Sequence, residues 1–468
     1  MEDKDLKYDI ALIRPNYDSH IITPQLGLGY LSSFLKNKNY NALIIDGLKQ
    51  KLNNQQIYMI LQQENINMAG ITCLSAYFNE VAVLSRFLKT KGLDKIIIGG
   101  IHPTFLPYQT LIETQADYVV CGEGEIPLFK LLENSCSNVY EDGQKIKGIY
   151  SLSELQNENT PFEKGEIVDN LDDLPYPDWE QIDPRTFPPA PHGQFVKHFP
   201  VATVFSSRGC PYSCKFCASP NFYNKKVRFR SAENVVGEIK LLSEKYGVRE
   251  IQFEDDNLTF NRAHIEKICA LILSDKIKLA FSCPNGIRAD KIDDALIKLM
   301  KKTGFYYCAL GIESANTNIL QNINKKEKIE TIQEAIHILN KNSITSQGFF
   351  IFGLPGETKE TIKETIHFAL YSGLERAQFL ILDVLPGCDL WTELKGHFIS
   401  NFSKKSYREP EWIPQGLDKN DLLNAQSKAF RKFFLRPNIF IKTIFYLKPR
   451  QIRYFLKRLL NYRFLQNQ

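Results

Sequence analysis

Short hydrophobic segments alternate with longer amphipathic ones along most of the chain. The first five short segments are rich in β-branched residues and lie at residues 8–13, 42–45, 69–74, 95–98 and 118–120. A stretch with helical periodicity follows each of them. Brief, continuously hydrophobic strands separated by helices are typical of a parallel sheet that is covered on both faces. The pattern predicts a doubly wound, flavodoxin-like α/β domain whose ligand lies beyond the carboxyl ends of the strands.

The same alternation resumes in the second half of the chain. Further strands are predicted at residues 200–205, 250–253, 280–283, 306–311, 347–352 and 377–382. Helical patterns separate them, for example at residues 232–246 and 329–340. These βα units predict a second α/β domain, in which chemistry belongs at the carboxyl ends of the strands.

Proline interrupts the pattern between the two regions. Residues 136–199 contain the runs Leu174–Trp179 and Phe187–Pro191, and proline at this density breaks regular elements. The expected organisation is therefore an N-terminal domain, a Pro-rich linker with a small hairpin near residue 150, a second domain and a helical C-terminal extension. Their expected bounds are 7–135, 136–199, 200–395 and 396–468.

Composition places the protein among ordinary globular chains. It has 468 residues, of which 43% are hydrophobic and 24% charged. The first residues lack the hydrophobic stretch of a secretory signal, and no hydrophobic run is long enough to span a bilayer, so a cytoplasmic location is expected. Ten cysteines, most of them scattered, do not form the pattern of a disulfide framework.

Three of the cysteines form one short motif. Cys210, Cys214 and Cys217 have C-x3-C-x2-C spacing directly after a predicted strand. A [4Fe-4S] cluster normally takes four thiolates, so a loop that supplies three leaves one iron open to a substrate or cofactor. The alternatives are a zinc knuckle or three structural thiols. Zinc requires a fourth nearby ligand, and neither His198 nor His264 has ligand-like spacing.

This motif resembles the signature of the radical S-adenosylmethionine (SAM) superfamily, including the aromatic residue before the last cysteine, Phe216. The resemblance implies a partial (β/α)6 barrel and a reduced cluster whose open iron binds SAM. It also implies reductive cleavage of SAM to a 5′-deoxyadenosyl radical.

Other strand ends of the second domain resemble SAM-binding motifs. The resemblance implies that Glu254 or Asp255 accepts a hydrogen bond from the SAM ammonium group and that Arg288 pairs with its carboxylate. It further implies contacts from Glu313 to the ribose and from the backbone at Gly353 to the adenine. The alternative for each charged residue is a surface salt bridge.

The first domain has small or polar residues at its strand ends, where glycine permits close approach of a ligand. With neighbouring motifs such as Pro24–Leu31 they resemble a cobalamin-binding domain, which implies cofactor contacts from six residues. These are Asp46, Ser75, Gly99, Gly100, Gly122 and Glu123. The motif that supplies a lower histidine ligand in many cobalamin enzymes is absent, because Leu48 stands where the histidine would be. His102 either approaches the corrin or caps backbone carbonyls.

The C-terminal segment is basic and aromatic. From Arg431 onward there are ten basic residues and no acidic one, which exceeds the net charge of +5 for the whole chain. One interpretation is a helical cap on the second domain, and the other is peripheral contact with an anionic membrane. No recognised RNA-binding module accompanies the charge. Cys388, near the last predicted strand end, is either a hydrogen donor or an inert small residue.

Together these features predict a cobalamin-dependent radical SAM enzyme with three cofactors: a [4Fe-4S] cluster, SAM and cobalamin. The leading hypothesis is methylation of an unactivated centre through methylcobalamin. The alternative reaction is oxidative cyclisation or rearrangement, as in anaerobic magnesium-protoporphyrin monomethyl ester cyclases, and a non-catalytic cobalamin sensor is a third hypothesis. The expected partners are a small or lipid-like substrate and an electron donor of flavodoxin or ferredoxin type, with no nucleic acid.

Overall fold

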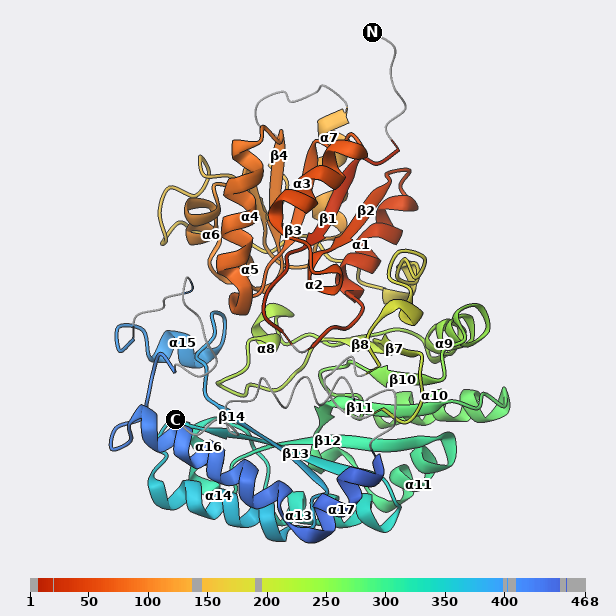
Figure 1. The fold of residues 1–468 in the computed structure, drawn as a ribbon, viewed down its shortest axis with the longest axis vertical. Coiled ribbons are helices and arrows are strands. Elements are labelled where there is room, and N and C mark those ends of the chain that lie inside the picture. The colour runs from red at the N-terminus through yellow and green to blue at the C-terminus, as the bar shows by residue number, and fades with distance from the viewer. Residues whose placement is uncertain are drawn as a thin grey trace. The chain divides into compact units, whose positions relative to one another are not determined.

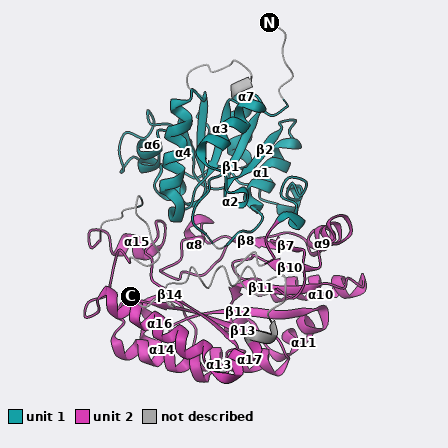
Figure 2. Ribbon diagram, in the orientation of Figure 1, with its two compact units in different colours: residues 1–186, 400–405 teal, residues 187–399, 406–468 magenta. Residues whose placement is uncertain are grey.

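The computed structural model describes residues 7–19, 21–136, 145–189, 196–398, 402, 410–446 and 452. The chain divides into two compact units (Figures 1 and 2). Unit 1 comprises residues 1–186 with 400–405, and unit 2 comprises residues 187–399 with 406–468. Each unit is an α/β structure built around its own sheet.

The sheet of unit 1 has six strands in the order β2-β1-β3-β4-β5-β6. Its strands are β1 (Ile10–Arg14), β2 (Ala42–Asp46), β3 (Met68–Thr72), β4 (Lys95–Gly99), β5 (Tyr118–Val120) and β6 (Ile149–Tyr150). The first five are parallel, and β6 pairs with β5 in antiparallel orientation. The order 2-1-3-4-5 is that of a flavodoxin-like fold, which confirms the predicted fold class.

Helices flank this sheet (Figure 1). They are α1 (Leu26–Lys36), α2 (Gly47–Gln50), α3 (Asn54–Gln63), α4 (Phe78–Thr90), α5 (Ile101–Phe105), α6 (Pro107–Thr114) and α7 (Glu125–Cys136), with 3-10 turns η1 (Ser75–Tyr77), η2 (Leu171–Asp173) and η3 (Pro184–Thr186). All five residues of β1 are buried, as expected for a strand covered on both faces. Helix α3 begins with a capping box formed by Asn53 and Gln56.

Much of the segment expected to be a linker packs within unit 1 instead. Strand β6 extends the sheet rather than forming a local hairpin. The side chain of Gln181 donates to the carbonyl of Ala42 and accepts from the N–H of Ile44 on the edge strand β2. Ser32 donates to Asp178 at 2.9 Å. Proline breaks helices but permits side-chain contacts of this kind. The density of proline residues therefore did not locate the boundary between the two units.

The sheet of unit 2 also has six strands, and all are parallel, in the order β14-β13-β12-β11-β10-β7. They are β7 (Val201–Val204), β10 (Glu250–Phe253), β11 (Ala280–Ile287), β12 (Phe305–Glu313), β13 (Thr345–Phe352) and β14 (Arg376–Ile381). A small ribbon of β8 (Ser207–Arg208) and β9 (Arg228–Phe229) follows β7. Consecutive strands lie side by side in an open sheet, which confirms the predicted six-unit partial barrel.

The helices of unit 2 include α9 and α13, which the sequence pattern predicted. They are α8 (Ser219–Phe222), α9 (Ala232–Tyr246), α10 (Arg262–Ser274), α11 (Asp294–Thr303), α12 (Thr317–Asn322), α13 (Ile329–Lys341), α14 (Lys359–Tyr371), α15 (Asp389–Glu393), α16 (Lys419–Phe434) and α17 (Pro437–Tyr446), with the 3-10 turn η4 (Ala289–Lys291). Side chains cap several of their N-termini, such as Ser231 on α9 and Asp293 on α11.

The C-terminal extension contains the helices α16 and α17. Helix α16 packs on the sheet through Phe433, which contacts Phe379 of β14, and Gln426, which donates to the carbonyl of Phe379 at 2.9 Å. This part of the extension is therefore a cap on unit 2. The rest of the basic C-terminal segment, apart from Ile452, lies outside the described residues.

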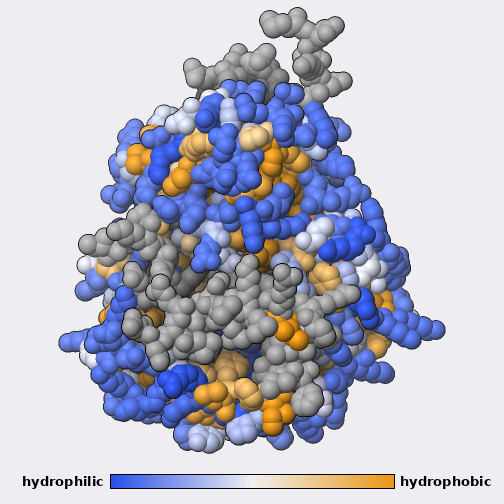
Figure 3. Space-filling view, in the orientation of Figure 1, coloured by the Kyte–Doolittle hydropathy of each residue, from blue (hydrophilic) through white to orange (hydrophobic). Residues whose placement is uncertain are grey.

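Hydrophilic side chains dominate the face of the described residues drawn in Figure 3, and hydrophobic ones gather in small groups. None of the helices within the described ranges combines the length and the hydrophobicity needed to cross a bilayer.

One buried ion pair joins the first two strands of unit 1. Nε of Arg14 donates to Asp46 at 2.8 Å, and a second guanidinium nitrogen contacts the other carboxylate oxygen. Both side chains are almost inaccessible to solvent, and Asp46 also accepts from the N–H of Lys49 at the start of α2. A bidentate buried pair of this kind fixes the ends of two neighbouring strands.

We expect the substitution Asp46→Asn to destabilise unit 1 by about 3 kcal/mol, because it leaves the Arg14 charge buried without its partner. Urea unfolding of unit 1 measures this change. The control is Glu163→Gln, which removes the exposed pair with Lys147 and should leave the unfolding curve unchanged. Equal stability of the Asp46→Asn variant and the wild type would contradict the structural role.

Candidate functional site

The cysteine loop of unit 2 begins at a position that only glycine can occupy. Gly209 follows β8 directly and has φ of +102°. A Cβ atom there would lie 2.1 Å from the carbonyl oxygen of Lys226, so any other residue would displace the backbone. The loop therefore leaves the ribbon in a fixed direction just before Cys210.

Backbone contacts from distant segments hold the same loop. The N–H of Lys215 donates to the carbonyl of Ile323 at 3.0 Å, and the amide of Asn324 donates to the carbonyl of Ser213 at 2.8 Å. On the other side, the N–H of Leu390 donates to the carbonyl of Lys215 at 2.9 Å. The loop thus has no regular secondary structure, yet it is positioned at several points.

The carboxylate of Asp255, which follows β10, is hydrogen-bonded to other residues of the chain. Its carboxylate is fully buried and accepts from the hydroxyls of Ser206 and Ser207 at 2.7 and 2.5 Å. It also accepts from the N–H of Ser206 at 3.1 Å. Asp255 therefore supports the turn that leads into the cysteine loop, while the neighbouring Glu254 side chain is partly exposed.

A buried network of four charged side chains surrounds the ends of β11 and β12. Nζ of Lys325 lies 3.1 Å from Glu313 and 3.4 Å from Glu327, and Arg288 lies 3.7 Å from Glu327. Burial raises the pKa of Glu313, and the charge of Lys325 opposes that shift. Glu313 itself has φ of +65°, an uncommon conformation for a residue with a side chain.

Arg288 links this network to the cysteine loop. Its guanidinium donates to the carbonyls of Lys325 and Lys326 and pairs with Asp290 at 2.9 Å. The same group lies over the ring of Tyr212, 3.9 Å from its centroid. Contacts within the chain therefore engage much of its hydrogen-bonding capacity.

The loop after β13 is built around Glu357. One carboxylate oxygen accepts from the N–H groups of Gly353 and Leu354, and the other has no hydrogen-bond partner within the described residues. Gly353 has φ of +89°, which glycine adopts without strain. Burial raises the pKa of Glu357 to about 7. Glu357 thus shapes the backbone at a predicted SAM-binding position.

The three thiols of the loop suit an iron–sulfur cluster better than a single metal ion. Burial raises the pKa of Cys210 to about 11 and that of Cys217 to about 12, and the three cysteines of the loop are free thiols. Within the described residues no three His, Cys, Asp or Glu side chains converge on one metal position. A cluster spreads its thiolates over separate irons, and bound iron stabilises their charged form. Phe216 is half-buried in the same loop.

In unit 1 the strand ends also carry the predicted residues. Gly100 has φ of +115°, and a Cβ atom there would lie 2.6 Å from the carbonyl oxygen of Cys73. Gly122 has φ of +95° and donates its N–H to Thr104, and the neighbouring Glu123 is buried. Gly99 has no close neighbour at the Cβ position other than Val120 at 3.8 Å.

His102 is buried beneath these loops. Its Nδ1 lies 2.9 Å from the Ser75 hydroxyl, and its ring stacks on Phe78 and meets Phe402 edge-on. One nitrogen of the ring therefore bonds a neighbouring side chain. Leu48, in place of a lower histidine ligand, is also buried.

Large hydrophobic side chains are exposed at this edge of unit 1. Ile21 after β1, Leu74 after β3 and Ile101 after β4 are 42%, 39% and 39% exposed. Exposed hydrophobic groups at the carboxyl ends of adjacent strands suit a large planar ligand such as a corrin. The donor and contact residues present in both units therefore fit the predicted cofactors. Asp46 serves the fold through Arg14, and its contact with a cofactor stays a prediction.

Two family models match the chain. One describes the radical SAM superfamily and matches residues 204–369, and the other describes the B12 binding domain and matches residues 19–132. An uncharacterised methyltransferase of Pyrococcus horikoshii is 30% identical over 428 residues, which cover 90% of each chain. This chain belongs to the radical SAM superfamily. Its N-terminal unit carries the B12-binding domain, so it is an enzyme that uses a [4Fe-4S] cluster, SAM and cobalamin.

Other similar proteins support this family. The anaerobic magnesium-protoporphyrin IX monomethyl ester cyclase of Rubrivivax gelatinosus is 26% identical, and the match covers 91% of this chain and 77% of the cyclase. Among solved structures, the cobalamin-dependent radical SAM enzyme OxsB with aqua-cobalamin and SAM has a TM-score of 0.72 and 17% identity. That match covers 98% of this chain and 71% of OxsB, and it supports the fold of the radical SAM member described here.

Several residues of the site could not be recognised in the sequence. Lys325 and Glu327 lie in the polar run Asn324–Lys328, which has the composition of an exposed turn. Positive φ angles at Asn324 and Lys326 fold this turn back and bury the two charged side chains. The only local signal for Glu357 was its place just before the N-terminus of a helical pattern.

The raised pKa of Glu357 predicts a pH dependence of stability. The folded protein holds this proton more tightly than the unfolded chain, whose pKa is near 4.5, so stability falls as pH rises from about 4.5 through 7. We expect wild type to lose roughly 3 kcal/mol relative to Glu357→Gln across that range, as measured by urea unfolding. The exposed Glu360 titrates below this range, so Glu360→Gln should retain the wild-type slope. Parallel slopes for wild type and Glu357→Gln would contradict the prediction.

Proposed function

We propose that this radical SAM enzyme transfers a methyl group from SAM to an unactivated centre of its substrate. The observation that carries the proposal is the presence of a three-cysteine loop and a cobalamin-binding unit in one chain. The cluster supplies radical chemistry with SAM, and cobalamin supplies a methyl carrier. Similarity to a named methyltransferase over 90% of the chain supports this reaction.

The protein's own residues then bind and orient the cofactors. Cys210, Cys214 and Cys217 would hold the cluster, with Phe216 packing in the same loop. In unit 2, SAM would contact Glu313, the backbone at Gly353, Arg288 and either Glu254 or Asp255. Asp255 and Arg288 would also position the loop through the contacts described above.

The proposed cobalamin contacts lie at the strand ends of unit 1. They are Asp46, Ser75, Gly99, Gly100, Gly122 and Glu123. The proposed domain limits remain residues 7–135 for cobalamin and 200–395 for radical chemistry, with unit 1 including much of the former linker.

Oxidative cyclisation or rearrangement is a second candidate reaction. It is favoured by the similarity to an anaerobic magnesium-protoporphyrin IX monomethyl ester cyclase over 91% of this chain. Both reactions use the same cofactors, so the binding residues alone do not separate them.

Radical SAM enzymes act on small molecules and need an external reductant. For this chain we propose a small or lipid-like substrate, a flavodoxin or ferredoxin as electron donor, and a cytoplasmic location. The cap formed by α16 favours packing on unit 2 over membrane contact for the described part of the extension. Peripheral contact with the inner membrane surface is then proposed only for the basic segment beyond it.

Turnover with SAM labelled in its methyl group distinguishes the two reactions. We expect the label to appear in the product of the anaerobically reconstituted enzyme, detected by mass spectrometry. The control is the triple variant Cys210→Ala, Cys214→Ala, Cys217→Ala, which should give no product. Turnover by the wild-type enzyme to a product without the label would exclude methyl transfer and favour cyclisation.

We expect Lys325→Met to weaken SAM binding at least about tenfold. Without the buried cation, burial would favour the neutral form of Glu313, and a hydrogen bond to a charged group contributes roughly 1.5–3 kcal/mol. Equilibrium titration of SAM into the reconstituted protein measures the effect. Lys298→Met removes a lysine from an exposed pair on α11 and should bind SAM normally. Wild-type affinity in Lys325→Met would contradict the proposed role of Glu313.

A further inference from the structure

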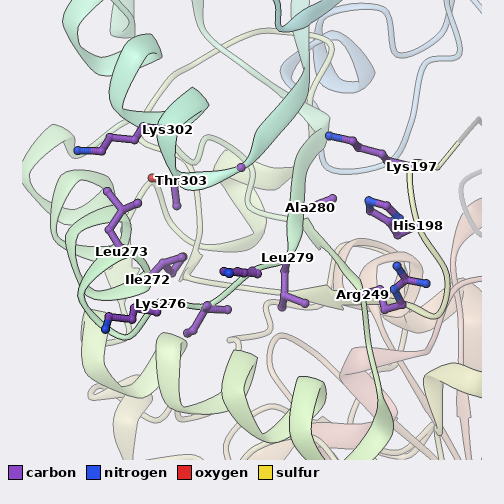
Figure 4. A pocket seen from close by; sticks show the side chains of 13 residues that line it. Lys197, His198, Arg249, Ile272, Leu273, Lys276, Leu279, Ala280, Lys302 and Thr303 are labelled. Atoms are coloured by element: carbon purple, nitrogen blue, oxygen red, sulfur yellow. The ribbon is translucent and has the colours of Figure 1, made fainter.

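A cavity lies in unit 2, away from the cysteine loop. Its volume is about 490 Å³, and its wall includes residues 197–198, Arg249, the end of α10, residues 276–280 and the end of α11 (Figure 4). Ala280 is the first residue of β11, and Arg249 precedes β10. The cavity is therefore at the amino ends of the parallel strands, whereas the cysteine loop follows the carboxyl end of β7. It is a different site from the one that binds the cluster.

The wall of this cavity is strongly basic. Five cationic side chains and His198 contribute to it, and it contains no Asp or Glu: the cations are Lys197, Arg249, Lys276, Lys278 and Lys302. In the close view Lys276 and Lys302 lie on one side of Leu279, and Lys197, His198 and Arg249 lie on the other (Figure 4).

Four of these cations have no ion-pair partner within the described residues. Within the described residues no salt bridge involves Arg249, Lys276, Lys278 or Lys302. The pKa of the adjacent Lys301 is lowered by burial and by repulsion from Lys197. Cations gathered in one concave region repel one another, and an anion that binds among them relieves this repulsion.

The negative charge of helix ends and nearby acidic residues neutralises only part of the positive charge of the cavity. Helices α10 and α11 end at this cavity, and each carries roughly half a negative charge at its C-terminus. Glu250 lies behind the wall and accepts from the N–H groups of Lys197 and His198 and from Tyr306, and burial raises its pKa. Asp275 pairs with Lys240. The four cations without an ion pair therefore exceed the local negative charge even when Glu250 is counted as ionised.

The remaining wall is hydrophobic. Ile272, Leu273, Ile277 and Leu279 line it between the basic groups. A volume of about 490 Å³ falls within the range of small-molecule sites, and the concave shape suits a compact ligand rather than an extended polymer. SAM carries a sulfonium cation and would be repelled here.

We propose that this cavity binds a small molecule that carries a diphosphate and a less polar part, as in a nucleoside diphosphate. Lysine and arginine side chains on both sides of Leu279 would contact the phosphate oxygens. The hydrophobic wall would contact the base or another apolar group. This site lies beyond the proposed reaction and adds a ligand to its substrate and cofactors.

Calorimetric titration of ADP and of inorganic pyrophosphate into the reconstituted enzyme, in magnesium-free buffer at low ionic strength, tests the proposal. We expect both to bind, ADP more tightly, and binding to weaken as salt rises because the charges are exposed. The double variant Arg249→Gln, Lys276→Gln should bind ADP at least tenfold more weakly. The control Lys36→Gln, Lys428→Gln removes the same charge from exposed positions outside the cavity and should bind as wild type.

Three results would overturn the proposal. The first is the absence of ADP and pyrophosphate binding at millimolar concentrations. The second is equal ADP affinity in the wild type and the cavity variant. The third is equal affinity for pyrophosphate and ADP, which would contradict the role given to the hydrophobic wall.

Discussion

The short segment at residues 323–327 holds the candidate site of unit 2 together. Its backbone binds the cysteine loop through Ile323 and the Arg288 guanidinium through Lys325. Its side chains extend this support, because Asn324 donates to the loop and Glu327 accepts from the N–H of Ala289. A loop that carries three cluster ligands has no sheet hydrogen bonds of its own, so its position depends on contacts of this kind.

The buried charges of this segment are costly unless they are paired. Lys325 lies between Glu313 and Glu327, and a Cβ atom at Gly311 would lie 2.9 Å from its Nζ, so the backbone passes close beneath the ion pair. Removing one member would leave an uncompensated charge in a buried place. The network therefore couples the end of β12, where Glu313 lies, to the cysteine loop. In unit 1 the pair of Arg14 and Asp46 has the same effect on two strand ends.

The sequence was most informative where a pattern of residues has a single structural interpretation. Continuous hydrophobic segments located every parallel strand of the two sheets, and Cys210, Cys214 and Cys217 carried the resemblance to the radical SAM superfamily. Charged residues were less informative, because the sequence does not reveal whether a carboxylate faces a ligand or the chain. Asp255 binds Ser206 and Ser207, and Lys325 lies in what reads as a surface turn. Such roles arise from contacts between residues far apart in the sequence, which local patterns do not encode.

The central claim is that one loop holds a four-iron cluster with an open iron. Iron and sulfide analysis of protein purified without oxygen tests it most directly, together with the electron paramagnetic resonance spectrum of the reduced protein before and after SAM is added. The account predicts about four irons and four sulfides per chain, a spectrum that SAM changes, and loss of both metal and signal when all three cysteines are replaced by alanine. A protein without stoichiometric iron, or a triple variant with an unchanged spectrum, would contradict it.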